Sequence, residues 1–329
     1  MLWLVTGGAG FIGSHLVEAL VARGARVRVL DDFSTGRWEN LASVRGRVEV
    51  VEGDVRDRTV VMRAVEGADV VAHLAAVASV PASLEDPAMV WAVNVEGTLN
   101  TLEAAREQGV RRFVFASSAA VYGDHTDLPL EEDLPPRPLS PYAASKAAGE
   151  ALCVAYYASY GVPTVALRFF NVYGPRQDPH SPYSGVISIF VDRMRRGLPP
   201  VIYGDGHQTR DFVYVADVVE AVLRAAEREE AVGAVFNIAG GRQTSVLELV
   251  KILNRTLGAS LKPTFAPPRA GEVRRSHADV QRVDKVLGWR ARVSLWEGIK
   301  RLVEGMQEES ISLPSPPSSP GLSGDRFTA

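Results

Sequence analysis

The sequence predicts an α/β protein, a doubly wound parallel sheet with a smaller, interleaved lobe toward the C-terminal end. Short runs of β-branched residues alternate with amphipathic helical patterns through the first half of the chain. A glycine cluster at residues 5–13 stands between the first such run and the first helix. After Asn171 the alternation gives way to segments that contain Gly and Pro. Strands that alternate with helices form parallel sheets through right-handed crossovers, with helices on both faces.

The elements of the larger predicted domain, residues 1–170, follow in order along the chain. Apolar residues spaced three and four positions apart predict helices from about Gly13, at 93–108 and at 142–160. Short apolar and β-branched runs predict strands at 2–6, 26–30, 48–52, 70–74, 112–116 and 163–169.

Residues 171–309 are predicted to form the smaller lobe. Helical patterns cover 241–258, where a Thr or Ser precedes the apolar positions as a cap, and 295–309. The stretch 211–238 combines a strand-like and a helical segment, and we expect it to return to the larger domain.

The composition changes at Ser310. From there the chain is rich in Ser and Pro and poor in apolar residues. Such a segment has too few apolar side chains to pack, so we expect residues 310–329 to be a disordered tail.

The overall composition excludes several classes of function. The chain has 329 residues, 46% of them hydrophobic, which is enough for a substantial core. Its net charge of −3 is spread without long blocks, so neither nucleic acid nor a membrane surface is an expected partner. Cys153 is the single cysteine, so no disulfide can form within the chain and a reducing compartment is expected. With no signal-peptide pattern and no apolar run near ~20 residues, we expect a cytoplasmic protein with a small soluble ligand.

Gly7, Gly10 and Gly13 follow the first strand and open the first helix. Glycines in this context permit a tight turn, let the backbone approach a pyrophosphate, and aim helix N–H groups at it. Asp31 ends the second strand, where a carboxylate accepts the ribose hydroxyls of an adenosine and repels a 2′-phosphate. The pattern therefore predicts NAD rather than NADP. Asp32 could bind the same ribose or be only a loop carboxylate.

The next two strand ends lie on the same predicted edge of the sheet. Asp54 ends the third strand, where it could bind an adenine amino group or serve a turn. Leu74, Ala75 and Ala76 end the fourth strand and leave room for a ring. His73 precedes them in an apolar run without Cys, Asp or Glu at ligand spacing, so we expect a buried histidine and no metal site.

Tyr142 and Lys146 stand four positions apart, so they share one face of a predicted helix. A free phenol has a pKa of about 10 and is a poor base at neutral pH. A fixed ammonium and the positive nicotinamide ring of NAD⁺ would favour the phenolate. Ser118 ends the strand before this helix and could hydrogen-bond the hydroxyl that Tyr142 deprotonates. Taken alone, Tyr142 and Lys146 could be a pair on the protein surface, and Ser118 could be a strand-end cap. Together the three residues predict a catalytic group.

Several motifs in this order resemble the extended short-chain dehydrogenase/reductase family, above all its UDP-sugar 4-epimerase branch. They are TGGAGFIG, DDFSTG, HLAA, SSAAVYG, YAASK and LRFFNVYGPRQ. The resemblance runs from residue 1 to about 305. It implies bound NAD, a UDP-sugar substrate, and a homodimer in which the helices near 94–108 and 142–160 pair with their copies. The residues expected to bind the cofactor are Gly7, Gly10, Phe11, Ile12, Gly13, Asp31, Asp32, Ser34, Gly36, Asp54, Val55, Leu74, Ala75, Ala76, Asn94, Tyr142, Lys146 and Phe169.

The resemblance also assigns a substrate site. It implies that Asn171 touches the sugar nucleotide and that Arg210 and Arg269 bind its diphosphate, although either Arg alone could be a solvated charge. It implies that Glu272 binds the uridine ribose, and further residues surround the uracil and the sugar. The residues expected to bind substrate are Ser79, Ser118, Tyr142, Asn171, Ile187, Tyr203, Arg210, Arg269, Glu272 and Ser276.

Departures from the family's motifs indicate which reaction and which sugars are expected. Similar dehydratases and decarboxylases carry acidic residues just after the position of Ser118, where this chain has Ala119 and Ala120. Elimination is therefore disfavoured. Ser276 and Ser79 match positions that hold larger residues in epimerases restricted to unacetylated sugars, so we expect a pocket for UDP-GlcNAc and UDP-GalNAc as well as UDP-glucose and UDP-galactose. The alternatives are an epimerase or oxidoreductase acting on UDP-glucuronate, a GDP-sugar or a dTDP-sugar, and an NAD-binding protein without catalysis.

Overall fold

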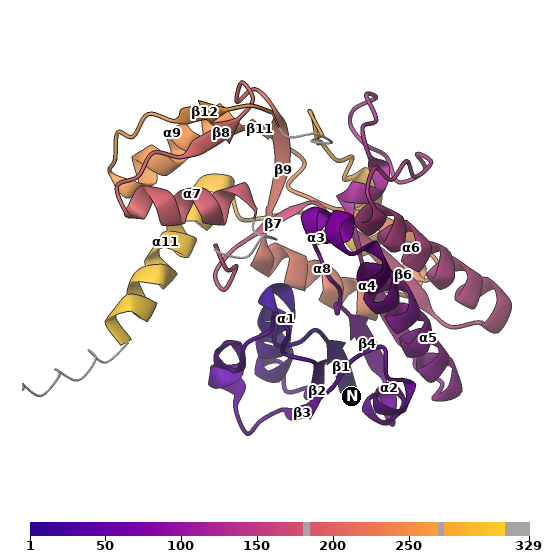
Figure 1. Cartoon of the computed structure of the whole chain (residues 1–329). Helices are drawn as coiled ribbons and strands as arrows, with labels where there is room; N and C mark the ends of the chain where they lie inside the picture. Colours follow the sequence, from indigo (N-terminus) through magenta and orange to yellow (C-terminus); the bar gives the residue numbers. More distant parts are fainter. Residues whose placement is uncertain (180–184, 269–272, 313–329) are drawn as a thin grey trace, which may run out of the picture.

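The computed structural model describes residues 1–179, 185–268 and 273–312 (Figure 1). Its centre is a seven-stranded sheet in which every pair of neighbours is parallel. In spatial order the strands are β10 (Val235–Ile238), β6 (Thr164–Phe169), β5 (Arg112–Ser118), β4 (Val70–His73), β1 (Leu2–Thr6), β2 (Arg26–Asp31) and β3 (Glu49–Glu52). The predicted fold class is confirmed. Because the order of strands reverses between β1 and β4, a crevice for a ligand is expected at the carboxyl ends of these strands.

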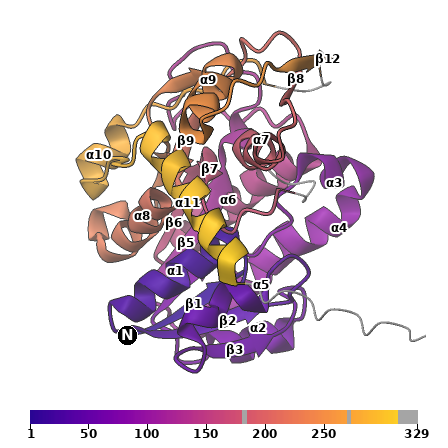
Figure 2. The ribbon, with the colours of Figure 1, turned by 90° about the vertical axis from the view of Figure 1, so that its left-hand side faces the viewer.

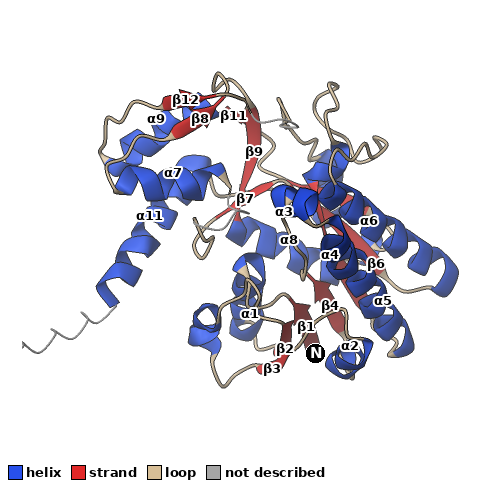
Figure 3. Cartoon of the chain, viewed as in Figure 1, coloured by secondary structure: helices blue, strands red, loops and turns tan. Residues whose placement is uncertain are grey.

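Helices cover both faces of this sheet (Figure 3). On one face, Leu16 of α1 and Val222 of α8 belong to one apolar cluster. On the other face, Val61, Leu102 and Cys153 join α2, α5 and α6 in a second cluster. The bounds of these helices are α1 (Phe11–Ala22), α8 (Val215–Glu227), α2 (Arg58–Val65), α5 (Gly97–Glu107) and α6 (Pro141–Tyr160).

The helix predicted at 93–108 has a more complex beginning. Two short helices, α3 (Val80–Glu85) and α4 (Pro87–Trp91), precede it, and a π-helical turn, η2 (Ala92–Glu96), joins α4 to α5. Single π-turns inside helices are frequent at functional sites. Asn94, expected near the cofactor, lies in this turn.

The smaller lobe packs its helices around a core of its own (Figures 1 and 2). The helix expected at 241–258 begins only at Val246, because Gln243–Ser245 pairs with β9 as an antiparallel strand. Helices of this lobe are α7 (Val186–Arg195), α9 (Val246–Leu257) and α11 (Leu295–Ser312). Its strands are β7 (Asn171–Tyr173), β9 (Thr209–Tyr214) and β11 (Gln243–Ser245) in one sheet, and β8 (Val201–Tyr203) and β12 (Thr264–Ala266) in another.

The stretch 211–238 belongs to both parts of the molecule. Its beginning lies in β9 of the smaller lobe, whereas α8 and β10 pack on and extend the large sheet. The remaining described helices are η1 (Trp38–Val44), η3 (Ala119–Tyr122), η4 (Glu229–Ala231) and α10 (Gln281–Leu287).

Helix α11 runs to Ser312 and so includes residues 310–312, the first three residues of the expected tail. The rest of the expected tail lies outside the described residues. Among the residues described, no helix combines the length and apolar character needed to cross a membrane.

Candidate active site

The glycine turn after β1 leaves no space for side chains. Gly7 has φ +68°, and a Cβ on it would lie 2.8 Å from the backbone N of Ala75. A Cβ on Gly13 would lie 2.1 Å from the carbonyl O of Gly7. Helix α1 begins after Gly10 without a side-chain cap, so backbone N–H groups of its first turn remain for an anion. These features fit the pyrophosphate of a dinucleotide.

Asp31 is buried beside this turn. One of its carboxylate oxygens accepts the backbone N–H of Ala9 at 2.8 Å, and the other accepts that of Phe33 at 2.9 Å. Burial raises the pKa of Asp31, and these two hydrogen bonds oppose the shift. By contrast, Asp32 is exposed and its carboxylate accepts the backbone N–H and hydroxyl of Ser34, which fits the alternative role as a loop carboxylate.

Contacts between neighbouring residues hold the segment that follows β3. Asp54 accepts the backbone N–H of Arg56 at 2.8 Å and forms an ion pair with its guanidinium, which lowers the pKa of Asp54. These contacts fit the turn role that the sequence left open for Asp54. Next to it, Val55 is buried against Gly97 of α5. On the other side of the glycine turn, a Cβ on Gly36 would lie 2.6 Å from Asp31.

His73 is a buried, fully hydrogen-bonded histidine, as predicted. Its Nδ1 lies 2.8 Å from the hydroxyl of Thr6 and its Nε2 lies 3.0 Å from that of Thr98. Burial lowers the pKa of His73 to about 3, and the positive charge of Lys146 acts in the same direction. The same Thr6 hydroxyl accepts the backbone N–H of Ala75, so it shapes the strand end that faces the glycine turn. The sequence alone did not indicate either threonine.

The catalytic candidates meet where β5 ends and α6 begins. Helix α6 starts with a Ser140 cap and a proline, which places Tyr142 in its first turn. Tyr142 is half-buried; burial raises its pKa, and a hydrogen bond with the Ser118 side chain opposes the shift. One turn further, Lys146 is buried and its Nζ donates to the carbonyl O of Ala116 at 2.8 Å. Burial lowers the pKa of Lys146 to about 8.

Asn94 links the π-helical turn to the catalytic helix. It is buried, its Oδ1 accepts the N–H of Val77 at 2.8 Å, and its Nδ2 donates to the hydroxyl of Ser145 at 2.9 Å. Ser145 in turn donates to the carbonyl O of Tyr142. Asn94 thus holds the segment after β4 against the first turns of α6, beside the cofactor crevice.

The expected substrate residues gather around β7 and β9. The Nδ2 of Asn171 donates to the carbonyl O of Asp211 at 3.2 Å. The Arg210 guanidinium donates to the carbonyl O of Thr209 at 2.9 Å and to that of Val273 at 2.8 Å. Ser276 is buried in the segment that follows Val273, so a small side chain occupies the expected wall position.

The remaining substrate candidates differ in their access to a ligand. Ile187 is 1% exposed and packs in the core of the smaller lobe, so in this structure it has no surface for a uracil ring. Ser79 is buried and caps helix α3, where its hydroxyl accepts the N–H of Ala82. Tyr203 on β8 is exposed. Arg269 and Glu272 lie outside the described residues.

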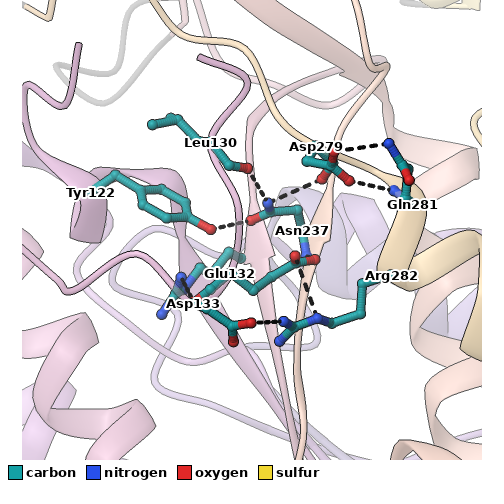
Figure 4. Close-up of polar contacts among 9 residues, drawn as sticks. Tyr122, Leu130, Glu132, Asp133, Asn237, Asp279, Gln281 and Arg282 are labelled. Carbon is teal, nitrogen blue, oxygen red and sulfur yellow. Dashed lines mark hydrogen bonds and ion pairs between the residues drawn. The ribbon is translucent and has the colours of Figure 1, made fainter. Parts of the chain in front are cut away.

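A buried polar network joins distant segments behind the site (Figure 4). The side-chain oxygen of Asn237 on β10 accepts the hydroxyl of Tyr122 at 2.7 Å, and its Nδ2 donates to the carbonyl O of Leu130 at 2.8 Å. The backbone N–H of Asn237 donates to Glu132, and Arg282 lies 3.6 Å from the same carboxylate. The network fixes the loop before α6 against the large sheet. It joins residues more than 100 positions apart, so no local pattern predicted it.

The glycine turn, Asp31 and the group on β5 and α6 lie at one edge of a parallel sheet, which defines a dinucleotide-dependent enzyme of the Rossmann type. Residues 3–239 match the family model described as the NAD dependent epimerase/dehydratase family. The chain belongs to this family, and the predicted use of NAD is confirmed.

The chain is similar along nearly its full length to proteins named as UDP-sugar 4-epimerases. It is 44% identical to a UDP-glucose 4-epimerase of Mycolicibacterium smegmatis, over 94% of this chain and 100% of the relative. The UDP-glucose 4-epimerase of Thermotoga maritima, solved with UDP-glucose, has a TM-score of 0.90 at 41% identity, covering 94% of this chain and 100% of the other. A UDP-N-acetylglucosamine 4-epimerase of Methanobrevibacter ruminantium, solved with UDP-N-acetylmuramic acid, has a TM-score of 0.89 at 35% identity, covering 93% and 98%. The resemblance to this branch is confirmed.

Proposed function

We propose that the chain inverts C4 of a UDP-hexose through a transient 4-keto sugar. The observation that carries this proposal is the grouping of Ser118, Tyr142 and Lys146 at the sheet edge that also holds the glycine turn. The similarity to proteins named UDP-glucose and UDP-N-acetylglucosamine 4-epimerases supports a UDP-hexose as the substrate.

In this proposal Tyr142 removes the proton of the sugar 4-hydroxyl, while Ser118 hydrogen-bonds the same oxygen and orients it. Burial raises the pKa of Tyr142, so positive charge has to favour the phenolate, and Lys146 supplies it from one turn away. The glycine turn and Asp31 would hold NAD, which when bound would supply the hydride acceptor and donor for C4. Arg210 retains the diphosphate while the keto sugar turns its other face to the site.

The residues after Ser118 favour epimerisation over elimination. Ala119 and Ala120 form the start of η3, where Ser118 accepts the N–H of Ala120 at 3.2 Å. These alanines supply no carboxyl group for the extra acid or base that a dehydratase or decarboxylase needs. Product analysis after separate incubations with UDP-glucose, UDP-GlcNAc, UDP-glucuronate and dTDP-glucose tests the proposal. We expect UDP-galactose and UDP-GalNAc without net reduction of NAD, whereas loss of water or carbon dioxide would contradict it.

The proposed acceptance of N-acetylated sugars depends on the small side chain of Ser276. Ser276→Tyr is expected to lower kcat/KM for UDP-GlcNAc by tenfold or more, because the larger side chain fills the volume of the acetyl group, and to change kcat/KM for UDP-glucose by less than about threefold. Steady-state kinetics with both substrates measure the two ratios. Ser276→Ala, which keeps the small volume, is the control and should retain both activities. Equal losses on both sugars in the Tyr variant would contradict this assignment.

We also propose that the chain forms a homodimer through α5 and α6. These helices pack against each other and expose apolar side chains, among them Leu99 on α5 and Val154 on α6, which are 39% and 50% exposed. Light scattering of the purified protein should give twice the chain mass of 35.5 kDa. Leu99→Glu combined with Val154→Glu should give the monomer mass, because carboxylates oppose burial in an interface. A monomeric wild-type protein would refute the proposal.

A further inference from the structure

A buried ion pair lies next to the catalytic lysine. Glu150 is 6% exposed and Arg168 is 3% exposed. The Nε of Arg168 donates to Oε1 of Glu150 at 2.9 Å, and its Nη2 donates to Oε2 at 2.7 Å, which is a forked, bidentate geometry. Because desolvation offsets most of the attraction in such a pair, stability alone is a weak reason for placing these charges here.

Glu150 also fastens the catalytic helix to the strand that carries Ser118. Its carboxylate accepts the hydroxyl of Ser117 on β5. One helical turn earlier, Lys146 donates to the carbonyl O of Ala116, the preceding residue of the same strand. Two residues of α6 therefore form hydrogen bonds with Ala116 and Ser117, the two residues of β5 that immediately precede Ser118. These contacts fix the spacing between Ser118 and Tyr142.

Glu150 is the anion that faces the buried ammonium. Burial disfavours the charged form of Lys146, and the charge of Glu150 acts against this effect. On the other elements around Lys146, His73 of β4 is neutral, Cys153 of α6 is a buried thiol whose pKa is raised, and Tyr142 is a phenol whose pKa is raised. Among the described groups near the lysine, none of these three offers a negative charge at neutral pH.

We propose that Glu150 is a positioning residue for the Tyr142–Lys146 pair: its carboxylate keeps the Lys146 ammonium charged and, through Ser117, holds α6 in register with β5. This inference rests on the proposed function, since it assigns to Lys146 the role of favouring the Tyr142 phenolate. Arg168 orients the Glu150 carboxylate through the bidentate contact, and its Nη1 is itself held by the carbonyl O of Glu132 at 3.0 Å.

The test follows the charge of Lys146 directly. The chain has only five lysines, and the other four, at positions 251, 262, 285 and 300, lie on or near α9, α10 and α11, so carbon-13 lysine labelling gives a simple NMR spectrum. In the NAD-bound protein, Glu150→Gln should move the titration midpoint of Lys146 about one pH unit lower than in the wild type. The alkaline limb of kcat/KM for the UDP-hexose should move in the same direction. Glu150→Asp, which keeps the charge, should retain the wild-type midpoint even where stability falls.

Glu103→Gln on α5 is the matched control. Glu103 likewise accepts a tyrosine hydroxyl, from Tyr156, and pairs with a guanidinium, that of Arg106, but its side chain is 24% exposed and its charge is not one of those that act on Lys146. This variant should leave the Lys146 midpoint and the pH profile unchanged. If Glu150→Gln does not fold, the double variant Glu150→Gln with Arg168→Met removes the unpaired cation, and its Lys146 midpoint should still be lower.

A Lys146 midpoint in Glu150→Gln equal to that of the wild type would overturn the inference. The NMR titration uses no substrate, so it remains decisive if the wild-type protein epimerises no UDP-hexose. The absence of UDP-hexose epimerisation would refute the proposed function. The titration midpoint of Lys146 would still decide the electrostatic role of Glu150.

Discussion

Tyr142→Phe is expected to lower kcat for the UDP-hexose by about 10³-fold while NAD remains bound. The substitution removes only the phenolic oxygen, which hydrogen-bonds to Ser118 and is the proposed base. The ring stays in the first turn of α6, so the packing of the helix on the sheet is retained. Steady-state rates and the NAD content of the purified variant measure the two effects separately.

Tyr160→Phe is the control for the loss of a hydroxyl from the same helix. Tyr160 is 59% exposed at the far end of α6 and contacts Arg106 rather than the sheet edge. This variant should keep the wild-type rate. Turnover in Tyr142→Phe within tenfold of the wild type would show that another group removes the proton.

Gly13→Ala is expected to abolish stable NAD binding and to lower the free energy of unfolding by about 1–3 kcal/mol. Its Cβ would lie 2.1 Å from the carbonyl O of Gly7, inside the turn that approaches the pyrophosphate. Because a rigid backbone atom causes this clash, the turn itself has to move. The NAD content after purification and thermal unfolding with and without added NAD provide the measurement.

Gly305→Ala is a matched control within another helix. A Cβ on Gly305 would lie 3.9 Å from Pro175, which is an ordinary contact. Ala is a better helix former than Gly, so this variant should bind NAD normally and be no less stable than the wild type. If Gly13→Ala retained its NAD, the glycine turn would not be the pyrophosphate site.

The sequence predicted the features that depend on neighbouring residues. Alternating apolar runs located six of the seven strands of the large sheet to within a few residues, because each strand is short and bounded by turn residues. The glycine spacing and Asp31 predicted the dinucleotide crevice because strand, turn and helix follow one another directly along the chain. The four-residue spacing predicted that Tyr142 and Lys146 share a helix face, because helix geometry is local.

Contacts between distant segments were not predictable in this way. The chain gave no local signal that Asn237 would bind Tyr122, or that Gln243–Ser245 would form a strand, since both depend on partners elsewhere in the fold. The assignment of Ile187 to the substrate came from the family resemblance, whereas the apolar face of α7 packs it into the lobe core. Arg168 and Glu150 offered a usable signal, because each is a charge within an otherwise apolar strand or helix pattern.

The chain returns to the large sheet through α8 and β10 after it has formed the first part of the smaller lobe. The stability of the large sheet therefore depends on residues that lie between the two parts of the smaller lobe in the sequence. A fragment ending at residue 170 would leave β6 as an open edge and would uncover the apolar surface that Val222 and Phe236 bury. Such a fragment should self-associate rather than fold as an independent cofactor carrier. Grafting a different substrate cap onto this scaffold therefore requires at least three splice points, one before the first part of the smaller lobe and one on either side of the returning segment, and not a single cut.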